Sequence, residues 1–91
     1  MNETMRALVV VALTKVAPDA EAEIAQLSDD EEFQNALGLD SIDFLNVMIE
    51  LKAATGVDVA ERDYGVVRTI GGCVAYLGAH GDAADTLNEK S

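Results

Sequence analysis

Residues 38–56 read GLDSIDFLNVMIELKAATG and carry the strongest helix signal in the chain. Apolar residues recur there every three to four positions, the pattern of a helix with one face against a core: Phe44, Val47, Met48, Leu51 and, in extension, Thr55. Asp40 followed by Asp43 resembles a capping box with Asp in place of Glu, and Gly56 is a typical C-terminal stop. We predict a helix that begins at Asp40–Ser41 and ends near Thr55.

A second apolar stripe, Ile42, Leu45 and Ile49, follows a neighbouring face of the same helix. One stripe is enough to join a small bundle, so two interpretations stay open. The second stripe either widens the buried face or remains exposed as a surface for a partner. With Asp40 as the cap, Ser41 is the first helical residue, and its hydroxyl has no structural duty and can point outward.

The flanking segments predict further helices and hence an all-α domain. A first helix is expected over about residues 2–17, with Asn2 or Thr4 as its cap and Pro18 after its end. Its single apolar face consists of Met5, Leu8, Val9, Ala12, Leu13 and Val16. Residues 18–40 follow as a long acidic connection with one helical turn expected near residues 20–27. Four apolar residues are expected to anchor this connection to the core: Ile24, Leu27, Phe33 and Leu37.

The C-terminal third predicts an extended segment at residues 57–59, a turn over 60–64 and a last helix. Thr69 is a good cap for that helix, and either Gly78 or Gly81 is expected to end it. Its apolar stripe is Val67, Ile70, Val74 and Leu77, with Cys73 and Tyr76 beside it. Gly71 and Gly72 weaken the helix and suggest close packing there.

Composition narrows the possible partners. The 91 residues are enough for one domain, with 17 acidic and 6 basic residues and a formal net charge of -11. Nucleic acid and anionic membranes are poor partners for such a chain, whereas a protein with a basic docking patch is complementary. Ten acids and no Lys or Arg lie between Val16 and Leu51. For residues 29–32 a plain solvated surface is an equal alternative.

Several classes of site are excluded by residue type. Cys73 is the single cysteine and His80 the single histidine, so neither a disulfide nor a Cys/His metal cluster can form within the chain. No calcium loop of the Asp-x-Asp-x-Asp-Gly kind occurs, and Gly-x-Ser-x-Gly of serine hydrolases is absent. The apolar residues 7–13 are too short to span a bilayer and lack the flanks of a signal peptide. We expect a cytoplasmic monomer.

The segment Leu37-Gly38-Leu39-Asp40-Ser41-Ile42-Asp43 resembles the phosphopantetheine-attachment motif of acyl and peptidyl carrier proteins, Gly-x-Asp-Ser-Leu, with Ile42 in place of leucine. The layout over roughly residues 5–77 is also similar to that family. The resemblance implies a small four-helix bundle of the acyl-carrier type, with a long loop between the first and second helices. We expect residues 1–81 to form the carrier domain and 82–91 a polar C-terminal tail.

The resemblance also implies a function, that of a carrier and not an enzyme. Ser41 would bear a 4'-phosphopantetheine arm from coenzyme A, attached by a separate phosphopantetheinyl transferase that uses Mg²⁺, with Asp40 contacting the metal or the transferase. The arm's thiol would carry acyl groups as thioesters to acyl-transferring, acyl-activating or synthase enzymes with basic docking patches. The residues that match the family's docking helix are Ile42, Asp43, Ile49 and Glu50.

The residues around Ser41 agree with this hypothesis on physical grounds. A serine at a helix start places a phosphate beside unpaired N–H groups and the positive end of the helix dipole. A lone serine needs activation, and the only histidine, His80, is far along the chain.

Two departures from the family pattern weaken the match to the housekeeping carrier of fatty-acid synthesis, so a specialised carrier fits as well. Asn46, Lys52 and Ala53 stand where that carrier has further acids, and Asn35-Ala36 precede the motif where an acid is common. Fatty-acid, other lipid, polyketide and peptide pathways all stay open. The alternative from another class is an acidic helical interaction module without a prosthetic group, in which Ser41 is never modified.

Overall fold

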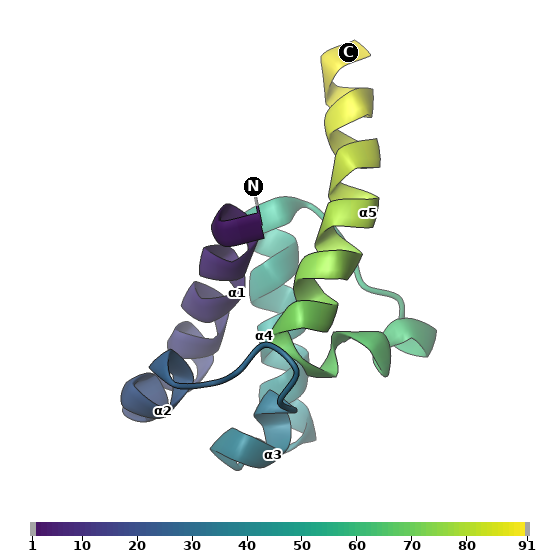
Figure 1. Ribbon diagram of the computed structural model, residues 1–91. Helices are drawn as coiled ribbons and strands as arrows, with labels where there is room; N and C mark the ends of the chain where they lie inside the picture. The colour runs from purple at the N-terminus through teal and green to yellow at the C-terminus, as the bar shows by residue number, and fades with distance from the viewer. Residues whose placement is uncertain (1, 91) are drawn as a thin grey trace.

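The computed structural model describes residues 2–90, with side chains described from residue 4 to residue 80, and it is helical throughout (Figure 1). Between residues 2 and 90 no strand occurs, only an isolated bridge between Glu32 and Thr69. The elements are α1 (Asn2–Val16), η1 (Pro18–Ala20), α2 (Glu21–Ala25), α3 (Phe33–Leu37), α4 (Ser41–Thr55), η2 (Glu61–Asp63), η3 (Val66–Arg68) and α5 (Ile70–Lys90), where η marks a 3-10 turn. The predicted all-α class is confirmed.

Three long helices build the core. Helix α1 packs against both α4 and α5, while η3 packs against α5. The predicted apolar faces of these helices are the buried ones, which include Val9 and Leu13 of α1, Val47 and Leu51 of α4, and Ile70, Cys73 and Leu77 of α5. Figure 1 shows α2 beside the end of α1 and α3 beside the start of α4, at the same end of the bundle.

The long connection between α1 and α4 contains two short helices. Helix α2 lies where a helical turn was expected, but α3 was not predicted. Phe33, Ala36 and Leu37 have helical spacing, yet five residues make little more than one turn, which is too short to distinguish a helix from a loop. The four predicted anchors do reach the core: Ile24, Leu27 and Phe33 are buried, and Leu37 is half-buried against them.

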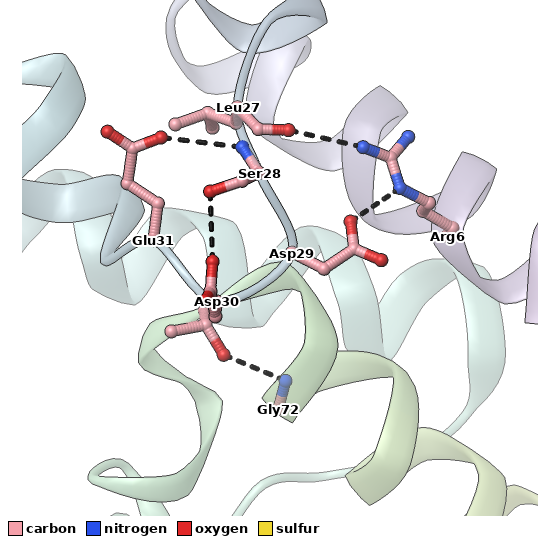
Figure 2. A network of polar contacts seen from close by, with 8 residues as sticks. Arg6, Leu27, Ser28, Asp29, Asp30, Glu31 and Gly72 are labelled. Carbon is pink, nitrogen blue, oxygen red and sulfur yellow. Dashed lines mark hydrogen bonds and ion pairs between the residues drawn. The ribbon is translucent and has the colours of Figure 1, made fainter.

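Asp29 ties this connection to both neighbouring helices (Figure 2). The Arg6 guanidinium of α1 donates to Asp29 Oδ1 at 2.8 Å and to the Leu27 carbonyl at 3.3 Å. On the other side, the Gly71 amide of α5 donates to the Asp29 carbonyl at 2.7 Å. The Ser28 hydroxyl donates to Asp30 Oδ1 at 3.0 Å. The acidic run is therefore more than a solvated surface, because Asp29 holds the connection in place.

Helix α5 begins as predicted but continues past both glycines expected to end it. Thr69 Oγ1 accepts from the Gly72 amide at 2.9 Å, which caps the start of the helix. A glycine ends a helix by adopting a left-handed backbone, and among the described residues Gly38 and Gly56 have positive φ, whereas Gly78 does not. The helix runs on to Lys90, and the expected tail, residues 82–91, lies outside the residues whose side chains are described.

Gly72 and Gly78 provide a matched pair for testing close packing in α5. A Cβ at Gly72 would collide with the Val66 carbonyl, whereas a Cβ at Gly78 would meet nothing. We expect Gly72→Ala to lower the free energy of unfolding by about 1–3 kcal/mol despite its better helix propensity. Gly78→Ala should raise it, by up to about 1 kcal/mol. Urea unfolding followed by circular dichroism measures both, and equal stabilisation of the two variants would contradict this packing.

Candidate functional site

Reciprocal capping fixes the start of α4. Asp40 has an extended backbone, with φ -90° and ψ -176°, and its Oδ1 accepts from the Asp43 amide at 2.8 Å. The Asp40 amide in turn donates to Asp43 Oδ2 at 3.4 Å. This is the predicted capping box, and it makes Ser41 the first residue of the helix. Gly38, with φ 68°, turns the chain into this cap.

Ser41 is exposed, and its immediate surroundings suit an anion. None of the hydrogen bonds described between residues 4 and 80 involves its hydroxyl, nor the backbone amides of Ser41 and Ile42. Unpaired amides in the first turn of a helix are expected, and together with the helix dipole they favour a phosphate. His80 is not bonded to Ser41, because its ring stacks on Tyr76 of α5 with centroids 4.0 Å apart.

The second apolar stripe of α4 is exposed, so it does not widen the buried face. Ile42 is 68% exposed, Leu45 43% and Ile49 62%. Asn46 and Ala53, also exposed, lie on the same side of the helix by its period. We call these five residues the α4 face. It is uncharged and begins beside Ser41.

The two acids grouped with this face have partners of their own. Asp43 takes part in the capping box, and Glu50 lies 3.6 Å from Lys15 Nζ of α1. On the other edge, Lys52 Nζ lies 3.4 Å from Asp58 Oδ2. The structure thus places Ile42 and Ile49 together on the α4 face and Asp43 and Glu50 along its border.

A groove of about 320 Å³ also opens beside Ser41. It is lined by residues of α3, α4, η2 and η3 and of the turn after η2: Gln34, Ser41, Phe44, Leu45, Glu61, Tyr64 and Arg68. Four of these residues, Gln34, Glu61, Tyr64 and Arg68, were not singled out from the sequence. Glu61, Tyr64 and Arg68 are distant from Ser41 along the chain, and Gln34 belongs to the unpredicted α3, so no local pattern connected them with it.

Cys73 and Tyr76 of α5 have raised pKa values without belonging to this site. Burial raises the pKa of the Cys73 thiol from 9.0 to about 12, and its Sγ lies 3.4 Å from the Val67 carbonyl. The pKa of Tyr76 is raised because its hydroxyl donates to Asp63 Oδ2 at 2.8 Å. Cys73 is therefore a buried, protonated side chain at neutral pH.

The described residues contain no group of three or more His, Cys, Asp or Glu side chains placed to hold a metal ion. None of the helices in this part of the chain combines the length and the apolar character needed to cross a membrane.

Comparison with known proteins shows the family of the chain. The family described as "Phosphopantetheine attachment site" matches residues 10–77. The chain belongs to the acyl carrier protein family. Its prosthetic group is 4'-phosphopantetheine, and its role is that of a carrier and not an enzyme.

Three curated relatives carry the name acyl carrier protein. The protein of Lactobacillus johnsonii is 33% identical over 55 residues, which are 60% of this chain and 69% of the relative. That of Lactobacillus acidophilus is 25% identical over 65 residues, covering 71% of this chain and 81% of the relative. That of Rickettsia bellii is 28% identical over 65 residues, covering 71% and 76%. No solved structure matches the chain.

The residues at the start of α4 fit a phosphopantetheine group. The group supplies a thiol on which an acyl chain is held as a thioester. To bear this group, the protein would offer an exposed hydroxyl and unpaired amides around the resulting phosphodiester. It would also keep the hydroxyl and the amides in fixed positions. The capping box and the exposed Ser41 side chain meet these needs without any rearrangement of the helix.

Burial of Cys73 predicts a loss of stability at alkaline pH. The folded protein holds the thiol proton to a pKa of about 12, whereas the unfolded chain releases it near 9.0. The contribution of the buried thiol to the free energy of unfolding is therefore fully present below pH 9, and it is lost as the pH rises from 9 toward 12. Between pH 8 and pH 10 the wild type should lose about 1 kcal/mol more than Cys73→Ala.

Urea unfolding at a series of pH values measures this difference. The quantity to compare is the change in the free energy of unfolding with pH, because Cys73→Ala also leaves a small cavity that lowers stability at every pH. Tyr76 contributes equally to both proteins, so its own titration cancels. Parallel pH profiles for the two proteins would contradict an ionisable Cys73 in the core.

Proposed function

We propose that Ser41 is the residue that carries the phosphopantetheine arm, and that this chain presents thioester-bound acyl groups to partner enzymes. The observation that supports it most is an exposed hydroxyl at a helix start fixed by the Asp40–Asp43 box, within a region that matches the attachment family. The attacking hydroxyl needs a base and a metal that these surroundings do not supply. A separate transferase brings coenzyme A, Mg²⁺ and the base.

Asp40 has a second role in this proposal. Its Oδ1 is engaged by the Asp43 amide, while no hydrogen bond is described for Oδ2. A carboxylate oxygen beside Ser41 can contact the Mg²⁺ of the transferase complex or a basic group of the transferase itself. The cap and this contact use different oxygens of the same side chain, so both roles are compatible.

The partner enzymes dock, in our proposal, on the α4 face. Ile42 and Ile49 supply apolar contact beside the arm, and the acids Asp43 and Glu50 on its border meet basic residues of the partner. An interface with an uncharged centre and acidic edges depends mainly on apolar burial for affinity and on charge for orientation. This composition favours a specialised carrier in a lipid, polyketide or peptide pathway over the housekeeping carrier of fatty-acid synthesis. We place it in the cytoplasm as a monomer, with residues 1–81 as the carrier domain.

Intact mass tests the attachment residue. When the chain is co-expressed with a broad-specificity phosphopantetheinyl transferase, wild type should gain the mass of one phosphopantetheinyl group. Ser41→Ala should gain none, because the accepting hydroxyl is gone. Ser28→Ala is the matched control, since Ser28 is also exposed but lies outside the motif, and it should be modified like wild type. Modification of Ser41→Ala would move the site elsewhere, and an unmodified wild type would sink the proposal.

The docking surface is tested with one exposed apolar residue of the α4 face and one elsewhere. Ile49→Asp should lower the kcat/KM of the transferase by about tenfold or more, because it places a charge in an apolar contact. Val11→Asp alters a residue that is 50% exposed on α1, and it should leave the kinetics unchanged. Circular dichroism checks the fold of both. Asp43→Lys is less informative, since it also breaks the capping box. Equal kinetics for both Asp variants would remove the α4 face from the interface.

A further inference from the structure

The groove beside Ser41 begins at the residue proposed to carry the arm. Its lining joins α4 to η2, to η3 and to the start of α3. A flexible group tethered at Ser41 samples this groove at high effective concentration, so weak contacts are enough to retain it. The inference below rests on the attachment proposed above.

The floor of this groove is aromatic and closed. Phe44 and Tyr64 meet edge to face with centroids 5.3 Å apart, and Phe33 stacks behind Phe44 at 6.2 Å. Phe44 is 7% exposed and Phe33 fully buried. A group that enters the groove therefore lies along the surface and does not penetrate the core. Gln34 and Glu61 add polar side chains to the lining, which suits an arm that alternates amides with apolar carbons.

Arg68 is the only basic residue that lines the groove. The arm would bring a phosphodiester into a region already occupied by the carboxylates of Asp40, Asp43 and Glu61. No Lys or Arg lies between Val16 and Leu51 to offset that charge. Of the residues that line the groove, the Arg68 guanidinium is thus the one group complementary to a phosphate, which it can bind through two parallel hydrogen bonds.

Arg68 forms an ion pair with Glu32 that a phosphate could easily replace. Its Nη1 lies 3.7 Å from Glu32 Oε1, and the two side chains are 54% and 46% exposed. Ion pairs of this kind contribute little to stability, so a phosphate that competes for the guanidinium meets little resistance. The backbone of Arg68, in contrast, is fixed, because Val67 before it is buried and Thr69 after it caps α5 and bridges to Glu32.

We propose that Arg68 is a positioning residue for the prosthetic group: its guanidinium leaves Glu32 to pair with the phosphodiester at Ser41, and the arm then lies in the groove between α4 and η2–η3. The arm's terminal thiol is shielded while the arm lies there. A docked partner that draws the arm out has only one exposed ion pair and a shallow apolar contact to break.

The test compares two arginine variants that change the net charge equally. Arg68→Gln removes the proposed contact, while Arg62→Gln removes an exposed arginine of η2 that does not line the groove. Each protein is first modified fully by excess transferase, and intact mass confirms the arm. A wild type that takes up no arm would reject the attachment proposal itself. A modified protein allows the Arg68 contact to be judged separately.

The rate at which the arm's thiol reacts with a thiol reagent then reports on shielding. We expect Arg68→Gln to raise this rate about two- to fivefold, as for the loss of one exposed charge-assisted contact. Arg62→Gln should match wild type, and Arg68→Lys should fall between. Buried Cys73, whose pKa is about 12, reacts too slowly to interfere.

Nuclear magnetic resonance gives a second readout that does not depend on the thiol. In the wild type, conversion from the unmodified to the modified form should shift the Arg68 Nε–H and Gln34 side-chain amide signals. In Arg68→Gln the Gln34 shift should be reduced, because the arm is no longer held beside it. Equal thiol rates in all variants, together with an unmoved Arg68 signal, would overturn the proposal.

Discussion

The hydrogen bond from the Gly71 amide to the Asp29 carbonyl is the constraint on which the rest of this small domain depends. It joins the start of α5 to the middle of a connection that contributes Ile24, Leu27 and Phe33 to the core. The approach is so close that a Cβ at Gly71 would lie 2.9 Å from the Asp29 oxygen. Arg6 holds the Asp29 carboxylate from the opposite side. If this contact is lost, the connection keeps its apolar anchors but loses the main-chain bond that holds it against the start of α5.

The few cations of the chain serve local structure, and this shapes the surface that partners meet. In the part of the chain whose side chains are described, four basic residues pair with acids: Arg6 with Asp29, Lys15 with Glu50, Lys52 with Asp58 and Arg68 with Glu32. Each pair is exposed and contributes little stability. The pairs of Lys15 with Glu50 and of Lys52 with Asp58 lie along the two edges of α4, on either side of its uncharged face.

Local patterns predicted the parts of the site that lie within one helix. Asp40, Ser41, Asp43 and Gly56 are ordered by capping rules that act over three or four residues, and the two stripes of α4 follow its period. The sequence could not decide whether the second stripe is buried, since burial depends on how many neighbours the bundle provides. Position along a helix also did not reveal that Glu50 faces Lys15, because that contact requires α1 to lie beside α4.

The contacts that sequence reasoning missed join residues far apart in the chain. Asp29 was one acid in a run of four, and nothing in that run distinguishes the one whose carbonyl meets Gly71. Helix α3 is too short for a period, and Gly78 resembles a helix stop until its backbone angle is known. Arg68 lies beside Ser41 in space only because the cap at Thr69 and the Glu32 bridge bring η3 back to α3 and α4.

The burial of Cys73 keeps the protein's own thiol apart from the thioester that the carrier holds. A carrier that holds acyl groups as thioesters must not let a second thiolate on its own chain capture them, because thioester exchange is rapid when the attacking thiol is ionised. The fold prevents this capture by enclosing Cys73 among apolar residues, where loss of its proton is strongly disfavoured. If Ser41 bears the arm, as proposed, the thiol at the end of that arm lies at the surface while Cys73 is enclosed. The packing that stabilises the bundle would then also keep the Cys73 thiol away from the cargo.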